Sequence, residues 1–288
     1  MISNTDIETL INTQCYDFEY LNFNKCGQFD NFIDVTYVIT MKDSERYNMV
    51  YKKLEVFNPT STVIVLNNFG YKKCKKILHK QNSAFDLTNA YLNVFYHSIK
   101  NNYKNILILE DDFEFDMVKM KDMKIINDLR YFFNKHRGEE FIYNIGTVPS
   151  LFNIIPVDTN HYRGFKIGYS QSIIYSNEIK VKVLIQGLNT KIEHFDHFIS
   201  KQFVNYFYKT PLCYQIFKKT ENSSLWLNGY LSTIFKLIKL DEKSKPGYEI
   251  YFYYSFINTH IYIILCSILV IFIIFNVFYI MINNKSII

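Results

Sequence analysis

The chain has 288 residues, enough for one domain of moderate size and an appendage. Hydrophobic residues make up 49% of it, the net charge is only +5 and no basic stretch interleaved with aromatics occurs, so nucleic-acid binding is not expected. The five cysteines are scattered without a CxxC pair, which argues against a zinc site or a disulfide framework and suits a reducing compartment.

Residues 1–30 show no clear hydrophobic period and are expected to form an irregular polar leader. After them, apolar runs at 35–40 and 62–66 predict two strands, and the polar stretch 43–55 between them predicts a helix. A longer helical pattern over 87–99 leads to the next apolar run. Strands that alternate with helices indicate an α/β fold, with a mostly parallel central sheet flanked by helices.

An apolar run at 106–109 ends abruptly in three adjacent carboxylates, Glu110, Asp111 and Asp112. Such a run is typical of a strand buried on both faces of a parallel sheet, and ligands bind beyond the carboxyl ends of such strands. Three acids would repel one another there unless a cation or the donor groups of a ligand shared the site. Carboxylate oxygens suit Mn²⁺ or Mg²⁺, usually alongside substrate phosphates. A solvated acidic loop after a core strand is the alternative.

Three segments, taken in order, resemble the glycosyltransferase family 25 group and, more broadly, the GT-A glycosyltransferases. They are residues 37–46, residues 106–112, and residues 193–196 followed by 208–215. The resemblance covers residues 33–226; its acidic motif is moderately specific, and the other two segments are weak alone. It implies a GT-A-like fold and a metal-dependent transfer of a sugar from a nucleotide-sugar donor to an acceptor of unknown kind.

By this resemblance, Glu110 and Asp112 stand where the D-x-D pair of the family falls, and alternation along an extended chain would point both side chains the same way. The metal ion would neutralise the diphosphate leaving group. We expect Asp112 to bind the metal, Glu110 to bind the metal or the ribose of the donor, and Asp111 to bind the sugar or to serve a structural role. Arg46 is a candidate for a donor phosphate because its guanidinium fork suits that geometry, and a surface pair with Asp43 is the alternative.

The acceptor hydroxyl must lose a proton as it attacks, which needs a carboxylate on the opposite side of the sugar. Asp196 stands where the late acidic residue of the family falls, so the resemblance implies that Asp196 is the catalytic base of an inverting reaction. A cap for the helix that begins nearby is the alternative role for this residue.

Residues 261–282 carry no charge, and these 22 residues would span roughly 33 Å as a helix, the length of one bilayer crossing. They are predicted to form a transmembrane helix because a buried core helix of this length would show a polar face. Four lysines precede the segment, at positions 236, 239, 243 and 245, and one follows it, at 285. This bias, together with reduced cysteines, places the main domain in the cytoplasm, as in a tail-anchored single-pass membrane protein.

The predicted organisation is a leader over 1–30, a glycosyltransferase-like domain over 31–235, a juxtamembrane hinge over 236–260, a transmembrane helix over 261–282 and a short tail over 283–288. The predicted function is a membrane-anchored glycosyltransferase with Mn²⁺ or Mg²⁺ as cofactor, a nucleotide-sugar donor as partner, and no nucleic acid.

Two alternatives come from other classes of protein. Residues 40–42 depart from the Asn-Leu-Asp-like tripeptide of the family, so a catalytically inactive, membrane-anchored scaffold with a degenerate transferase fold stays open. The acidic strand also resembles the opening strand of phospho-receiver domains, with Asp158 near the place of the phospho-acceptor. Pro156 would interrupt the acceptor strand, and at least two strands precede the acidic one, which argue against a receiver.

Overall fold

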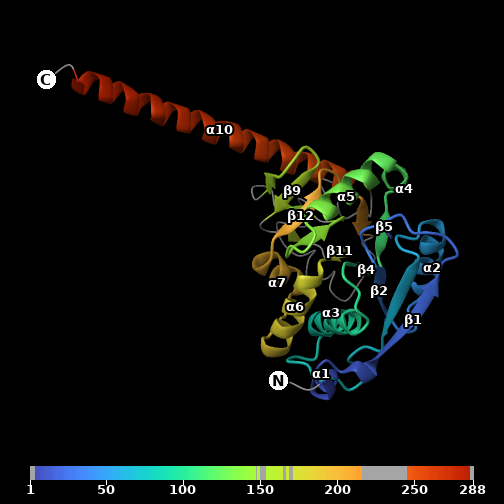
Figure 1. Cartoon of the computed structure of the whole chain (residues 1–288). Coiled ribbons are helices and arrows are strands. Elements are labelled where there is room, and N and C mark those ends of the chain that lie inside the picture. Colours follow the sequence, from blue (N-terminus) through green and yellow to red (C-terminus); the bar gives the residue numbers. More distant parts are fainter. Residues whose placement is uncertain are drawn as a thin grey trace.

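The computed structural model describes residues 4–146, 148–149, 154–164, 167–168, 171–215 and 245–285. The described chain is a mixed α/β domain with a large central sheet, from which one long helix, α10 (Lys245–Lys285), projects (Figure 1). In spatial order the sheet contains β1 (Tyr16–Asn22), β3 (Thr62–Asn68), β2 (Val35–Met41), β4 (Ile106–Glu110), β11 (Ser172–Tyr175), β6 (Ile142–Asn144), β12 (Asn205–Tyr208), β9 (His161–Gly164) and β8 (Ile154–Pro156).

The α/β class is confirmed, but the sheet as a whole is mixed. The strand β2 pairs in parallel with both β3 and β4, and β12 pairs in parallel with β6. The other neighbours are antiparallel, among them β11, which lies between β4 and β6. The expectation of a mostly parallel sheet therefore holds for β3, β2 and β4 and for β6 with β12, where helices cross over between strands, and the remaining pairs make the sheet as a whole mixed.

Helices cover both faces of the sheet. One face carries α3 (Ser83–Lys100), α6 (Asn177–Asn189) and α7 (Phe195–Gln202), and the other carries α2 (Tyr47–Val56), α4 (Met117–Met120) and α5 (Met123–Lys135). Alternate residues of β4 feed the two cores: Ile106 and Ile108 face α3, whereas Leu107 and Leu109 lie in the core with α2 and α5. This two-sided burial explains why the strand is apolar without interruption.

The remaining short elements lie at the margins of this sandwich. The chain opens with α1 (Asn4–Leu10) and the 3₁₀ turn η1 (Thr13–Cys15), and two small antiparallel ladders pair β5 (Phe113–Phe115) with β13 (Cys213–Gln215) and β7 (Val148–Pro149) with β10 (Ile167–Gly168).

In place of the irregular leader expected over residues 1–30, the structure has a helix and an edge strand. β1 pairs with β3 along its whole length, from Tyr16 opposite Asn68 to Asn22 opposite Thr62. Most residues of β1 are at least partly exposed because the strand lies at the edge of the sheet. An edge strand of this kind needs no apolar run, so the hydrophobic period does not reveal it.

The expectation that no disulfide forms is wrong for Cys15 and Cys74, which are bridged with a Cα–Cα distance of 5.8 Å. The pairing of β1 with β3 causes this proximity, because it brings the start of β1 beside the loop that follows β3, where the Phe69 amide donates to the Cys15 carbonyl at 3.1 Å. Cys26, Cys213 and Cys266 are free. One of the two grounds for a cytoplasmic domain, reduced cysteines, is thereby removed.

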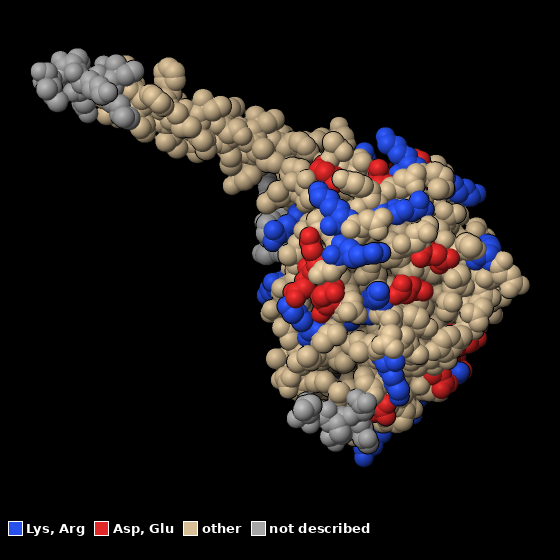
Figure 2. Space-filling model, viewed as in Figure 1, with Lys and Arg blue, Asp and Glu red and all other residues tan. Residues whose placement is uncertain are grey.

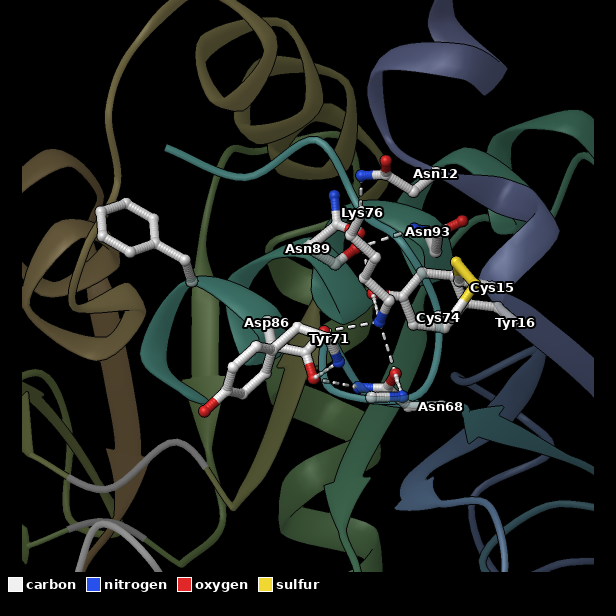
Figure 3. A network of polar contacts seen from close by, with 12 residues as sticks. Asn12, Cys15, Tyr16, Asn68, Tyr71, Cys74, Lys76, Asp86, Asn89 and Asn93 are labelled. Carbon is white, nitrogen blue, oxygen red and sulfur yellow. Dashed lines mark hydrogen bonds and ion pairs between the residues drawn. A yellow bond between two sulfur atoms is a disulfide. The ribbon is translucent and has the colours of Figure 1, made fainter. Parts of the chain in front are cut away.

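A buried polar network lies beside the disulfide (Figure 3). At its centre the Lys76 ammonium donates to the Tyr16 hydroxyl at 2.9 Å and contacts the carboxylate of Asp86 and the amide oxygen of Asn68, each at 2.5 Å. The second carboxylate oxygen of Asp86 accepts from the Asn68 side chain at 3.2 Å. The loop that carries Lys76 and Cys74 is thus held against β1, β3 and α3 by one disulfide and one ion pair.

α10 contains the 28-residue segment Tyr253–Ile280, which is long and apolar enough to cross a membrane, and the most apolar 18-residue window of this segment has a mean hydropathy of 2.9. The helix already begins at Lys245, so the part of the expected hinge from 245 to 260 is helical, whereas 236–244 lies outside the described residues. Pro246 is compatible with this start because the first turn of a helix tolerates proline.

Candidate functional site

The three carboxylates lie at the carboxyl end of β4, between β2 and β11 near the middle of the sheet. Glu110 is the last residue of the strand, and Asp111 and Asp112 form the turn that leads into β5. The alternation expected to point Glu110 and Asp112 the same way stops here because the chain is no longer extended. The three side chains consequently meet three different elements.

Asp111 is held by the end of β2 and the start of α2. Its carboxylate accepts from the Arg46 guanidinium at 2.6 Å and from the Thr40 hydroxyl at 3.2 Å. The alternative considered for Arg46, a surface pair with Asp43, is wrong, because Arg46 pairs with Asp111 and Asp43 lies 3.5 Å from the Lys73 ammonium. The Arg46–Asp111 pair is mostly shielded from solvent and ties α2 to the acidic turn, an arrangement that suits the structural role considered for Asp111.

Asp112 is the buried member of the group, with only 6% of its surface exposed. One carboxylate oxygen, Oδ2, accepts from the Gln215 side chain at 2.9 Å. The other, Oδ1, and the amide oxygen of Gln215 have no hydrogen-bond partner among the described residues. Burial raises the pKa of Asp112 to about 6, against the opposing effect of the Gln215 hydrogen bond. A buried carboxylate oxygen without a donor is what a bound cation would satisfy.

Glu110 faces α3 and α7. Its carboxylate accepts from the Tyr91 hydroxyl at 2.9 Å, and the Tyr91 ring stacks on Phe195, the first residue of α7, at 4.1 Å. Burial, followed by the charges of Glu110 and Asp196, raises the pKa of the Tyr175 hydroxyl well above its usual value. The Tyr91–Phe195 stack places the start of α7, which carries Asp196, beside the Tyr91–Glu110 pair.

Asp196 lies in the first turn of α7 and is partly exposed. Its carboxylate accepts from the His197 amide at 2.8 Å, a favourable position because the N-terminus of a helix carries a partial positive charge. The helix begins after His194, whose side chain makes no capping bond. Asp196 therefore satisfies part of the helix start and still presents a carboxylate on the side of the sheet where Glu110 lies.

Two residues of this region carry no role in the sequence-based predictions. In the sequence, Tyr91 is only one of the residues in the apolar stripe of a predicted helix. Its hydroxyl, a polar group within that stripe, was the one signal that could have marked it as a site residue. Gln171 is fully buried at the start of β11; its backbone carbonyl accepts from the Glu110 amide at 2.9 Å and its side chain donates to the Gly146 carbonyl. The amide oxygen of Gln171 has no partner among the described residues, and no local sequence pattern marks it.

No cluster of three or more His, Cys, Asp or Glu side chains suited to a metal occurs within the part of the chain that the structure describes. A divalent ion at the acidic turn would thus be held by one or two carboxylates and would draw its other ligands from water and substrate phosphates. This is the usual arrangement for Mg²⁺ in proteins.

The phospho-receiver alternative is contradicted by the order of the strands. Asp158 follows β8, and β11, β6, β12 and β9 lie between β8 and β4. Five strand spacings of about 4.8 Å put the two strands roughly 24 Å apart, too far for Asp158 and Asp112 to share one site. The Asp158 carboxylate instead accepts from the amides of Asn160 and His161, each at 2.8 Å.

Comparisons with known proteins do not assign a family. No protein-family model matches the chain, and no curated protein sequence matches it. Among solved structures, it is similar to the crystal structure of mannose-1-phosphate geranyltransferase from Thermus thermophilus, with a TM-score of 0.23 and 12% identity over 75% of this chain and 67% of that one. A TM-score this low carries no argument about fold or activity.

Proposed function

We propose that this domain is a GT-A-like, metal-dependent glycosyltransferase that moves a sugar from a nucleotide-sugar donor to an unidentified acceptor. The observation that carries the proposal is the buried carboxylate of Asp112, which keeps one oxygen without a partner among the described residues at the carboxyl edge of a sheet. Ligands of open α/β sheets bind at such edges. The sequence resemblance over residues 33–226 supports the same interpretation.

The residues present fit a divalent cation. Asp112 would hold Mn²⁺ or Mg²⁺ through its hard carboxylate oxygens, and Gln215 would orient Asp112 through the hydrogen bond at 2.9 Å. Glu110, whose carboxylate faces α3 and α7, would take the other role expected for it and bind the ribose of the donor. When bound, the ion neutralises the charge that develops on a diphosphate leaving group. Asp112 would bind the ion in its ionised form. Burial favours the protonated form of this carboxylate, but the positive charge of a bound cation favours the ionised form.

The donor phosphates would lie beside the Arg46–Asp111 pair. One nitrogen of the Arg46 guanidinium is bonded to Asp111, and the group carries further N–H donors in a fixed fork. Asp111 thus holds the guanidinium in place, and Arg46 would donate to a phosphate oxygen with the rest of its fork. Both residues would thus belong to the donor site: Arg46 would contact the donor, and Asp111 would hold Arg46 in place.

Asp196 would accept the proton of the acceptor hydroxyl. Its support is the approach of α7 to the acidic turn through the Tyr91–Phe195 stack at 4.1 Å, together with its partial exposure. A carboxylate that a substrate can reach is a suitable acceptor for the proton of an attacking hydroxyl. Inversion at the sugar carbon would follow from attack on the face opposite the leaving diphosphate.

We also propose that α10 anchors the protein as a single-pass membrane segment. The support is the length and hydropathy of Tyr253–Ile280, all of whose most apolar window is exposed. The lysines before the segment favour a cytoplasmic domain, whereas the Cys15–Cys74 disulfide is typical of oxidising compartments.

The decisive experiment exposes the full-length protein in detergent to a panel of nucleotide sugars with Mn²⁺ and measures donor hydrolysis and metal-dependent binding. Hydrolysis or binding of one particular nucleotide sugar supports the transferase proposal if a chelator abolishes it and if Asp112→Asn also abolishes it. The matched control is Asp43→Asn, because Asp43 is an exposed carboxylate outside the acidic turn. A folded wild-type protein that stays silent across the panel rejects the transferase and leaves the inactive scaffold.

A further inference from the structure

The segment of α10 that can cross a membrane begins before the helix leaves the domain. Tyr253 is its first residue, yet Ser255 and Thr259 are buried against the domain. The Phe256 ring meets the edge of the Tyr162 ring of β9 with centroids 4.5 Å apart. Because α10 is continuous, no break separates the part of the helix that packs against the domain from the apolar segment.

The part of α10 that extends beyond the domain is about as long as the hydrocarbon core of one bilayer is thick. Residues 260–280, the 21 that follow the last buried contact, span about 31 Å at 1.5 Å per residue. The hydrocarbon core of a bilayer is about 30 Å thick. A membrane crossed by this helix must therefore begin where the helix leaves the domain, which brings the adjoining protein surface to the headgroup layer.

The adjoining surface is the β8 edge of the sheet. Figure 1 shows α10 running past β9 and leaving the domain on that side, away from β1 at the opposite edge of the sheet. On the outer strand, Ile155 is 49% exposed, and Val157, just beyond it, is 37% exposed. An edge strand with exposed apolar residues is ordinarily protected, since it can otherwise pair with other chains. Figure 2 shows Lys and Arg side chains, with Asp and Glu among them, on the domain near the base of α10, where the charged headgroups of lipids would lie.

We infer that the β8 edge rests in the headgroup layer of the bilayer that α10 crosses, with Ile155 and Val157 in contact with lipid. The inference rests on the proposed anchoring by α10 and is independent of sugar transfer. Because the β8 edge adjoins the point where the apolar helix leaves the domain, a phospholipid bilayer is the partner that would cover this edge. The contact adds apolar burial and fixes the tilt of the sheet, and so the height of the acidic turn above the membrane.

The test uses full-length protein in phosphatidylcholine vesicles that contain some anionic phosphatidylserine, with lipids brominated near the headgroup end of the acyl chain. Tryptophan is introduced by Ile155→Trp and, in a second protein, by Val157→Trp. The control is Val56→Trp, because Val56 is 68% exposed on α2, remote from α10. The single native tryptophan, Trp226, contributes to the emission of every variant and is subtracted with the wild type.

We expect brominated lipid to quench the added emission of Ile155→Trp and Val157→Trp but not that of Val56→Trp. Unquenched emission from both edge variants, in vesicles that retain the protein after alkaline carbonate extraction, overturns the inference. Loss of the protein on extraction would instead reject the anchoring by α10. Added emission that depends on protein density and not on bromine identifies a second copy of the chain on this edge and also overturns the bilayer contact.

Discussion

Gln215 and Asp112 are joined by a hydrogen bond of 2.9 Å across 103 residues of sequence. The residue before Gln215 on β13, Tyr214, donates to the Glu249 carboxylate of α10 at 3.3 Å. Neighbouring residues of one short strand thus contact the acidic turn and the beginning of the long helix. The candidate site and the proposed anchor are connected through β13, and the connection makes Gln215 a residue worth testing on its own.

Replacing Gln215 by Leu should weaken Mn²⁺ binding about 10- to 100-fold, the usual effect of losing a residue that orients a metal ligand. The change removes the donor to Asp112 Oδ2 and leaves a buried carboxylate without its hydrogen bond. Isothermal titration of full-length protein in detergent measures the effect. Gln202→Leu is the matched control, since Gln202 is exposed at the end of α7, and equal affinities in the two variants would contradict the role of Gln215.

Asp112→Asn should stabilise the metal-free protein at neutral pH while abolishing metal binding. Burial raises the pKa of Asp112 from 3.8 to about 6, so the folded state binds a proton more tightly than the unfolded state does. Stability from this group is therefore present at low pH and is lost as pH rises from about 4 through 6. The asparagine side chain has no charge and does not titrate, so Asp112→Asn avoids this loss of unfolding free energy, which is on the order of 2–3 kcal/mol at pH 7.

Thermal unfolding with a chelator present, followed from pH 4 to pH 7.5, checks the sign of this effect. The melting temperature of Asp112→Asn should exceed that of the wild type at the upper pH, and the difference should shrink toward the lower pH. Asp43→Asn should follow the wild type throughout because Asp43 is exposed. A variant that melts below the wild type at pH 7.5 would show that the ionised carboxylate is stabilising.

Lys76 and Asp86 form a buried ion pair, and removing either partner should be strongly destabilising. Both side chains are almost wholly shielded from solvent, so Lys76→Met leaves a buried carboxylate without its cation. Breaking such a pair costs about 3–5 kcal/mol. Lys73→Met is the matched control in the same loop, because the Lys73–Asp43 pair is exposed and its loss should have little effect. Chemical unfolding compares the two, and equal midpoints would refute the structural role of the buried pair.

Alkylation of denatured protein should modify three cysteines without reductant and five with it, because Cys15 and Cys74 are bridged. Reducing the bridge should lower stability by about 2–4 kcal/mol, since it constrains the unfolded chain. Cys74→Ser should reproduce that loss, and Cys26→Ser, at an exposed free cysteine, should not. Five modifiable thiols without reductant, in protein trapped by alkylation during cell lysis, would contradict the bridge and return the domain to the cytoplasmic side that the lysine bias favours.

Elements that have a local signal can be predicted from the amino-acid sequence alone. Strands β2, β3 and β4 are continuous apolar runs because each is buried on both faces, and the apolar segment of α10 stands out by length and hydropathy. The acidic turn is equally visible, since three carboxylates interrupt a buried strand. These features depend only on residues that are close together along the chain.

The contacts between residues that are distant in sequence could not be predicted and follow from the tertiary structure. The edge strand β1 has no apolar run, and its pairing with β3 is what brings Cys15 to Cys74 across 59 residues. The order of the strands also decides which residues meet at the acidic turn. Gln215 hydrogen-bonds to Asp112, and Arg46 pairs with Asp111 and not with Asp43. Asp158, which follows the edge strand β8, lies far from the turn. Register and strand order are set by the packing of distant segments against one another, so no window of sequence contains them.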